Sequence, residues 1–406
     1  MRTVIRNGNL LDTTSMSIVG ECTVVIEDGL IVSVGEEPTG EADVELDAEG
    51  QFLMPGFIDG HAHFRLATMD FHRLSQWSEV EFGIAMKKLA AETLQRGFTT
   101  VRDLGGEVTG LMRAIDQGMA QGPRIFHAGR MLTQTGGHGD VDGGIRPVPD
   151  CACQMSHDAF SIIADGVDAV RKGARHILRD GSQFIKIHVS GGVASPSDPL
   201  DSVQYTEEEI RAVTQEARNR HTYVAAHAYT PPAIRQAVEN GVHTIEHGNL
   251  IDKPTAKLMA AKGAVLVPTL STYEAMHEVG KELGMPAKNL QKNTMVFERG
   301  IGSLELAKSA GVTLGFGTDL IGETQVRQNR EFAIRAEVEP AKDILHSMYH
   351  VNAQLCRMEG KAGVIAPGAY GDVVVSRINP LEEIAGLSDP EANISAVIHN
   401  GAPVDR

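Results

Sequence analysis

PGFIDGHAHF (residues 55–64) carries an apolar run that ends in two histidines two positions apart. Side chains alternate along a β-strand, so His61 and His63 share one face while Ala62 faces the other way. A strand of this kind would bring two potential metal ligands to one point, because imidazole suits zinc and similar metals. Two histidines spaced in this way are also often ordinary polar residues, so their meaning depends on the rest of the chain.

Seven more short apolar stretches follow, separated by segments with the pattern of amphipathic helices. One such segment, residues 206–221, begins with Thr206 and Glu209, which together predict a capping box. Repeated alternation of strand and helix indicates a parallel sheet, and eight strands favour an α/β fold of the (β/α)₈ TIM-like barrel type. The expected strands are residues 57–64, 98–104, 124–129, 184–191, 223–229, 243–249, 264–270 and 312–320.

The two ends of the chain have a different pattern, rich in short β-strands. TVVIEDGLIVSVG (23–35) places Asp28 and Gly29 between two β-branched runs, which is a strong hairpin signal. Similar stretches occupy residues 372–378 and 395–404. We therefore predict a small β-sandwich domain formed by both chain termini, residues 1–56 and 361–406, with the barrel formed by residues 57–360.

Composition and charge exclude several classes of protein. The chain has 406 residues, of which 42% are hydrophobic and 22% charged, so a large core is available. A formal net charge of −16 argues against a nucleic-acid partner, which needs a concentrated basic patch. The four cysteines, including the close pair Cys151 and Cys153, are too few for a disulfide framework. Without an apolar leader or a long apolar run, we expect a cytoplasmic protein with no membrane partner.

Metal-competent residues recur near the C-terminal ends of the predicted strands. Active sites of (β/α)₈ barrels are built at that face from several different strands. Lys186, taken alone, would be a surface lysine, but its strand looks buried and burying an ammonium group is costly. The arrangement therefore favours one shared metal site over unrelated polar residues. The candidates are His61 and His63 on the first strand, Lys186 on the fourth, His227 on the fifth, His247 on the sixth and Asp319 on the eighth.

These residues lie in motifs that resemble the amidohydrolase superfamily, in its binuclear, carboxylated-lysine branch. The motifs are PGFIDGHAHF, FIKIHVSGG, AAHAY, IEHG and GFGTDL. The resemblance spans nearly the whole chain, including the β-domain formed by both termini. Within the superfamily the chain most resembles the prolidase-like and arginine-carboxypeptidase-like dipeptidases, whose close relatives act on N-acyl amino acids.

The resemblance implies two divalent metal ions, for which zinc is the first expectation. Lys186 would bridge them as a carbamate formed from its amine and CO₂, because an ammonium group cannot ligate a cation whereas a carbamate is an anionic ligand with two oxygens. The more buried metal would be bound by His61, His63 and Asp319, and the more exposed metal by His227 and His247.

The expected chemistry is hydrolysis of an amide bond. Two metals would lower the pKa of a bound water and polarise the scissile carbonyl, and Asp319 would carry the proton to the leaving amine. The related mononuclear deaminases usually have a glutamate three residues after the histidine of the fifth strand, where this chain has Thr230. They also lack a lysine equivalent to Lys186. Both departures argue against deamination.

Residues in the loops after the strands are expected to set the substrate preference. His138 lies in a glycine-rich loop (133–147) that would serve as a lid, and it is a candidate ligand of a substrate carboxylate. Tyr229 is a second candidate, and Arg65 a third because a guanidinium group binds a carboxylate with two hydrogen bonds. His188 is expected to line the pocket or to support a metal ligand. Each of these residues could instead have a purely structural role.

We therefore predict a dipeptidase or N-acyl-amino-acid hydrolase whose substrate is a small molecule with a free C-terminal carboxylate. Proline is the first choice of leaving amino acid, chiefly from the resemblance. Release of arginine or lysine is the runner-up and would need an acidic pocket residue, for which Glu274, Glu278 and Glu323 are candidates. The same metals would also suit a lactonase or phosphotriesterase, and a non-catalytic metal-binding scaffold is a rival from a different class. The resemblance also suggests a homo-oligomer.

Overall fold

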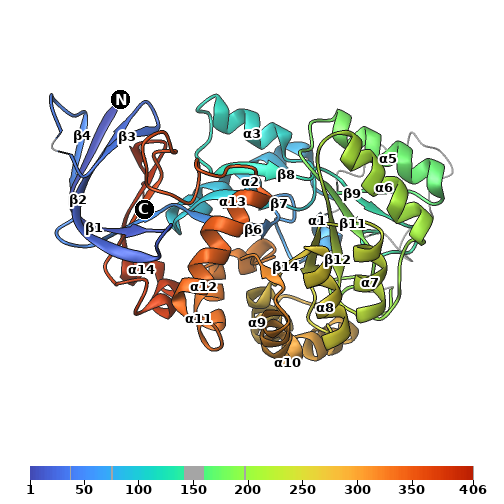
Figure 1. Cartoon of the computed structure of the whole chain (residues 1–406). Coiled ribbons are helices and arrows are strands. Elements are labelled where there is room, and N and C mark those ends of the chain that lie inside the picture. Colours follow the sequence, from blue (N-terminus) through green and yellow to red (C-terminus); the bar gives the residue numbers. More distant parts are fainter. Residues whose placement is uncertain (37, 75, 141–159, 196–197, 406) are drawn as a thin grey trace.

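The structure is a computed structural model that describes the whole chain except residues 37, 75, 141–159, 196–197 and 406 (Figure 1). Each of the eight stretches expected to be a strand of the parallel sheet contains one, and each pairs in parallel with its sequence neighbour wherever the two belong to one sheet. These strands are β6 (Phe57–Ala62), β7 (Phe98–Asp103), β8 (Arg124–His127), β11 (Ile185–His188), β12 (Val224–Ala228), β13 (Thr244–His247), β14 (Val265–Val267) and β15 (Thr313–Leu314).

The eight strands are divided between two sheets. Strands β6, β7 and β8 form a three-stranded sheet, and β11 to β15 belong to a seven-stranded sheet that also contains β9 (Met131–Thr133) and β10 (Ser161–Ile163). Strands β9 and β10 were not expected. The strand order and direction expected for a (β/α)₈ fold are present, but the described strands do not close into one hydrogen-bonded sheet.

The two seams between these sheets are spanned by isolated backbone hydrogen bonds. Gln183 N donates to His127 O (3.0 Å) at one seam, and Gly60 N donates to Phe316 O (2.7 Å) at the other. At the second seam the Asn352 side-chain amide donates to the Ile58 and Phe316 carbonyl oxygens (2.8 and 2.7 Å) and accepts from Phe316 N (3.2 Å). An inserted side chain therefore occupies the backbone groups that a continuous ladder would use.

Helices cover the outside of the parallel strands (Figure 1). In α6 the predicted capping box is present, because Thr206 accepts from Glu209 N and the Glu209 side chain accepts from Thr206 N. The apolar side of α6 is buried against the strands, as the amphipathic pattern predicts. The main helices are α2 (Glu79–Gln95), α3 (Thr109–Asp116), α5 (Val167–Arg179), α6 (Glu207–Asn219), α7 (Pro231–Glu239), α8 (Lys253–Lys262), α9 (Leu270–Val279), α10 (Ala287–Ser309), α11 (Arg330–Ala336) and α12 (Ala341–His346).

Both termini contribute to a separate eight-stranded sheet, seen at the left of Figure 1. The predicted hairpin is present, with Asp28 and Gly29 at positive φ (47° and 80°) between its two strands. The C-terminal strand β16 pairs antiparallel with β5, which joins the two ends of the chain. The domain boundaries themselves stay predictions. The strands are β1 (Arg2–Asp12), β2 (Ser17–Glu27), β3 (Leu30–Val34), β4 (Val44–Asp47), β5 (Phe52–Pro55), β16 (Val373–Ser376), β17 (Ile394–His399) and β18 (Ala402–Pro403).

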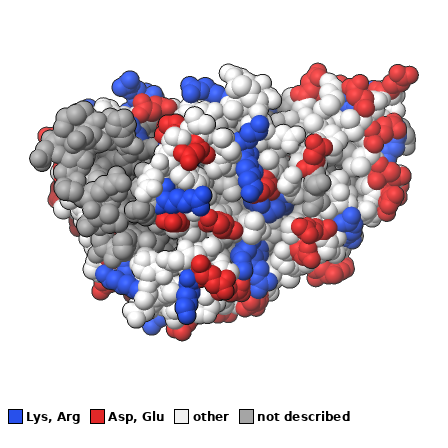
Figure 2. Space-filling view, turned by 180° about the vertical axis from the view of Figure 1, so that it is seen from behind, with Lys and Arg blue, Asp and Glu red and all other residues white. Residues whose placement is uncertain are grey.

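The described surface mixes charges of both signs. Figure 2 shows Lys and Arg side chains interspersed with Asp and Glu on one face of the molecule. None of the described helices is both long enough and apolar enough to span a bilayer. Cys22 and Cys356 are free thiols, whereas Cys151 and Cys153 lie outside the described residues.

Candidate active site

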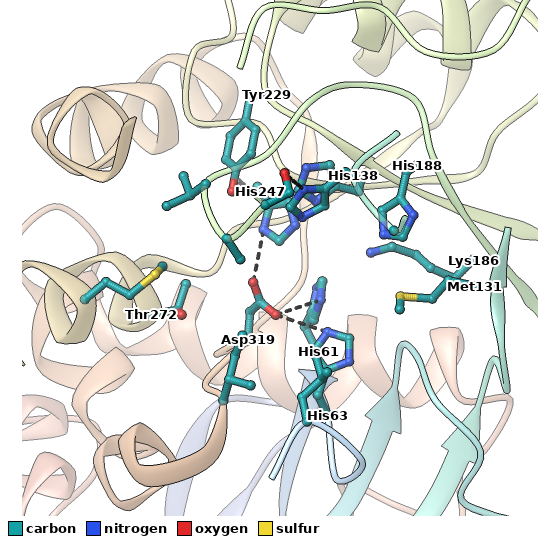
Figure 3. Close-up of a pocket in the computed structure, with 18 of the residues that line it drawn as sticks. His61, His63, Met131, His138, Lys186, His188, Tyr229, His247, Thr272 and Asp319 are labelled. Carbon is teal, nitrogen blue, oxygen red and sulfur yellow. Dashed lines mark hydrogen bonds and ion pairs between the residues drawn. The ribbon is translucent and has the colours of Figure 1, made fainter. Parts of the chain in front are cut away.

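The six residues predicted as metal ligands come together at one pocket at the C-terminal ends of the parallel strands (Figure 3). The pocket has a cavity volume of about 90 Å³. Its polar lining includes all six of these residues and also three of the four predicted substrate-binding residues. These nine are His61, His63, His138, Lys186, His188, His227, Tyr229, His247 and Asp319.

The Asp319 carboxylate lies at the centre of the histidines. Its Oδ1 is 3.3 Å from His61 Nε2 and 3.1 Å from His63 Nε2, and its Oδ2 is 3.7 Å from His247 Nδ1. Burial by itself would raise the pKa of Asp319, but the adjacent His61 and His63 hold it well below its usual range. Asp319 and His247 both have positive φ (52° and 76°), a conformation that aims the two side chains into the pocket at the strand ends.

A buried ion pair between Arg102 and Glu246 orients the His61 ring. His61 Nδ1 is 2.9 Å from Glu246 Oε2, and Arg102 Nη2 donates to both Glu246 oxygens at 2.8 and 2.7 Å. Glu246 and Arg102 are completely buried. The attraction of Arg102 outweighs the burial of Glu246, so the pKa of this carboxyl lies well below its usual range. A carboxylate on one ring nitrogen fixes the ring and its tautomer, which leaves Nε2 for a ligand in the pocket.

Three other histidines are held through one ring nitrogen in the same way. His63 Nδ1 lies 3.4 Å from Gly105 O, and His227 Nε2 lies 3.2 Å from Gly191 O. His247 Nδ1 lies 2.8 Å from Thr269 Oγ1. His227 and His247 therefore keep their other ring nitrogen available among the described residues, and neutral imidazoles of this kind are metal ligands. The other nitrogen of His63, Nε2, faces the Asp319 carboxylate.

Lys186 lies inside this group of histidines, and its side chain is almost completely buried. Burial lowers the pKa of its amine to about 8, although Glu246 and Asp319 act in the opposite direction. Among the described residues no hydrogen bond to this amine is present. The donor set of imidazoles, one carboxylate and a buried amine fits a site for divalent metal ions, and the ligand atoms of His61, His247 and Asp319 all lie within 4.8 Å of one another.

The pocket also contains residues suited to binding an organic ligand. Tyr229 Oη lies 2.8 Å from Tyr273 Oη, and the His138 ring stacks on His227 with 4.2 Å between the ring centres. His188 is buried and makes an edge contact with both of these histidine rings. Apolar side chains also line the pocket, namely Leu66, Phe71, Met131, Val193, Met276 and Ile321.

Sequence reasoning missed several of these residues. Glu246 stands beside His247 in a strand, and strict alternation would put the two on opposite faces; the positive φ of His247 breaks that alternation. Arg102 and Glu246 are 144 positions apart, so nothing local joins them. Tyr273 lies in a helix after the seventh expected strand and belongs to none of the recognised motifs.

The structure places Arg65, a predicted substrate-binding residue, against helix α2. Its guanidinium donates to both carboxylate oxygens of Glu79 (3.0 and 2.6 Å) and lies 3.9 Å from the ring centre of Phe82, both on α2. Arg65 is not part of the pocket lining. The helix beside it offers a carboxylate that binds both Nη groups and an aromatic face that covers the guanidinium, while Arg65 Nε has no hydrogen-bond partner among the described residues.

The three glutamates proposed for an acidic pocket are also bound elsewhere. Glu274 accepts two hydrogen bonds from Arg330, and Glu278 is paired with Arg327. Glu323 accepts from Thr68 Oγ1 (2.8 Å) and Met69 N (3.0 Å). Asp319 is thus the only carboxylate in the described lining of the pocket.

Solved structures with the same architecture cover the whole chain. One is described as a prolidase complexed with N-methylphosphonate-L-proline, with a TM-score of 0.94, 42% identity and 100% coverage of both chains. Another is a Xaa-Pro dipeptidase with bound methionine in its active site, with a TM-score of 0.89, 29% identity and 100% coverage of both chains.

Sequence comparison adds two further findings. The ochratoxinase of Aspergillus niger is 28% identical over 392 residues, which are 91% of this chain and 80% of that protein. Residues 52–404 match the amidohydrolase family. This range contains the pocket histidines, Lys186 and Asp319. The chain therefore belongs to the amidohydrolase family.

Proposed function

We propose that the protein hydrolyses the amide bond of a small substrate with a free C-terminal carboxylate, with an Xaa-Pro dipeptide as the first candidate. The observation that carries this proposal is the convergence of oriented histidines on the Asp319 carboxylate, next to a pocket that contains His138 and Tyr229. Similarity to a prolidase and to a Xaa-Pro dipeptidase over the whole chain supports proline as the leaving amino acid.

The proposed cofactors are two divalent metal ions, with zinc as the first expectation. His61, His63 and Asp319 would hold one ion, and His227 and His247 the other. Lys186 would bridge them as a carbamate, and the lowered pKa of its amine, about 8, favours the neutral form that adds to CO₂. When bound, the ions supply an acidified water and polarise the substrate carbonyl.

Protons would be handled by Asp319. Its carboxylate stays ionised at neutral pH because its pKa lies well below the usual range, so it is ready to accept a proton from the attacking water. The same oxygen would then donate this proton to the nitrogen of the leaving amino acid. The nearby His61 and His63 rings hold the carboxylate in place during both transfers.

Tyr229 and His138 would bind the substrate carboxylate. The Tyr229 hydroxyl lies next to that of Tyr273 and has a proton to donate, and the His138 ring lies on the same side of the pocket (Figure 3). The apolar side chains of the pocket would take the uncharged part of the substrate and keep water from the reacting bond. Release of arginine or lysine is less well supported, because Glu274, Glu278 and Glu323 are engaged away from the pocket.

The test is release of amino acids by the zinc-loaded protein from a panel of Xaa-Pro, Xaa-Arg, Xaa-Lys and N-acyl amino acids. We expect proline release that a chelator abolishes and added zinc restores. The variant Lys186→Met should lose metal and turnover together, whereas Lys172→Met, on the exposed side of α5, should keep both. Failure to release any amino acid, or full activity in the presence of the chelator, would contradict the proposal.

A further inference from the structure

Helix α10 carries a polar stripe on its buried side, where a barrel helix ordinarily presents apolar residues. Asn289, Lys292 and Asn293 are 2%, 6% and 1% exposed. Burying a lysine ammonium is costly unless all of its protons are bound. The hydrogen-bond partners of these three residues therefore indicate the role of the stripe.

The Lys292 ammonium donates three hydrogen bonds to backbone carbonyl oxygens of one loop. The acceptors are the carbonyl oxygens of Gly192 (2.9 Å), Ser195 (2.8 Å) and Asp198 (2.6 Å). One turn earlier on the helix, Asn289 Nδ2 donates to Ala194 O (2.8 Å). We call residues 191–195 and Asp198 the clamped loop; it follows β11.

The clamped loop touches the active site at several points. Its Val193, Ala194 and Ser195 line the pocket, and Gly191 O lies 3.2 Å from His227 Nε2. A Cβ atom added at Gly192 would lie 2.1 Å from Cε1 of His138, so the backbone passes directly against that ring. A shift of the loop would therefore move both histidines.

A chain of side-chain hydrogen bonds fixes His138 to the same loop. Ser195 Oγ donates to Asp198 Oδ1, so the Ser195 oxygen is left to accept from His138 Nδ1 at 2.8 Å. The other Asp198 oxygen accepts from Gly192 N (2.9 Å) and Gln204 Nε2 (3.2 Å). With Nδ1 occupied, Nε2 is the His138 nitrogen that remains for a ligand in the pocket.

Helix α10 also contacts Tyr273, which lies next to Tyr229. Asn293 Nδ2 donates to Tyr273 O at 3.0 Å, and Tyr273 Oη contacts Tyr229 Oη. One face of a single helix thus connects to both residues proposed to bind the substrate carboxylate, His138 through the clamped loop and Tyr229 through Tyr273.

We propose that Lys292 is a positioning residue for substrate binding, because its ammonium clamps the loop that fixes His138 and borders the pocket. It touches neither the reacting atoms nor the predicted metal ligands, so it acts through the loop. The kinetic part of this inference rests on the proposed function, whereas the effect on the loop does not.

The test compares Lys292→Met with Lys292→Arg and with the control Arg299→Met, an exposed cation two turns later on the same helix. Hydrogen–deuterium exchange of the zinc-loaded protein should become about tenfold faster in peptides covering residues 190–195 of Lys292→Met, because three charged hydrogen bonds are lost. KM for an Xaa-Pro substrate should rise about tenfold while kcat changes less than about threefold. Lys292→Arg should restore part of both effects, and Arg299→Met should match the unmodified protein.

Unchanged exchange and unchanged KM in Lys292→Met, with only a lower melting temperature, would overturn the proposal. Should that variant fail to fold, Ser195→Ala decides, because it keeps all three hydrogen bonds of Lys292 and removes the hydrogen bonds of Ser195 Oγ to His138 and Asp198. Ser195→Ala should raise KM, and a normal KM would overturn the proposal. If the unmodified protein releases no amino acid from any substrate, the proposed function fails, and the exchange comparison alone then decides the clamp.

Discussion

The two walls of the pocket are built in different ways. Five of the six predicted metal ligands lie on parallel strands or directly after one, and Asp319 lies five residues after β15; these six residues form the strand wall. Buried partners such as Glu246 and Arg102 support this wall from inside the sheet. In the loop wall, His138 lies in a loop and Tyr229 directly follows β12, and both are supported by residues of loops and outer helices such as Ser195, Tyr273 and Lys292.

This difference indicates which changes each wall tolerates. Strand positions share their backbone hydrogen bonds with both neighbours, so a ligand there cannot move without disturbing the sheet. Loop positions depend on a few side-chain hydrogen bonds, each worth about 1 kcal/mol. We therefore expect substitutions on the strand wall to affect turnover, metal binding and stability, and substitutions on the loop wall to affect mainly KM.

The largest effect is expected at the centre of the strand wall. Asp319→Asn removes the proposed proton acceptor and keeps the side-chain shape, so kcat should fall by about 10³-fold or more with the fold retained. Steady-state kinetics together with circular dichroism measure this. Turnover near that of the unmodified enzyme would show that Asp319 carries no proton.

The next effect concerns the support behind the strand wall. Glu246→Gln leaves Arg102 buried without its full counter-charge, which should lower the free energy of unfolding by about 3–5 kcal/mol. Because His61 loses its anionic partner, zinc affinity should also fall by about 10–100-fold. Denaturant unfolding and competitive metal titration test both effects, and Glu208→Gln, at an exposed position of α6, is the control. An unchanged zinc affinity in Glu246→Gln would show that Glu246 does not support metal binding.

A smaller effect is expected on the loop wall. Tyr273→Phe removes the hydroxyl that lies 2.8 Å from Tyr229 Oη, so KM should rise about fivefold with little change in kcat. The matched control is Tyr349→Phe, because the Tyr349 hydroxyl is also buried but donates to Pro55 O. That control should lose stability and keep its KM. Equal KM values in the two variants would remove Tyr273 from substrate binding.

The smallest effect is expected at Arg65, which lies outside both walls. Arg65→Met should lower the free energy of unfolding by about 1 kcal/mol, because it loses a partly exposed ion pair with Glu79 and the contact with Phe82. KM should stay the same within the error of the measurement. An increase in KM as large as that of Tyr273→Phe would restore Arg65 as a candidate for carboxylate binding.

Local sequence patterns predicted the elements of the fold well. Each of the eight expected stretches contains a strand, and the hairpin at Asp28 and Gly29 and the capping box of α6 are both present. These features depend on residues within a few positions of one another. The division of the strands into two sheets was not predictable in this way, because Asn352 enters the seam between β6 and β15 from a distant part of the chain.

By itself the sequence indicated the order of the eight expected strands, the meeting of both termini in one small domain and the six predicted metal ligands that gather in the pocket. Strand periodicity and the rule that parallel strands end at one face are sufficient for these conclusions. Only the tertiary structure decided the partners of these and neighbouring residues. Glu246 and Arg102 support His61, Glu79 binds Arg65, and Lys292 binds the clamped loop. Burial makes every polar group find a partner, and that partner is chosen by proximity in space, which local sequence does not encode.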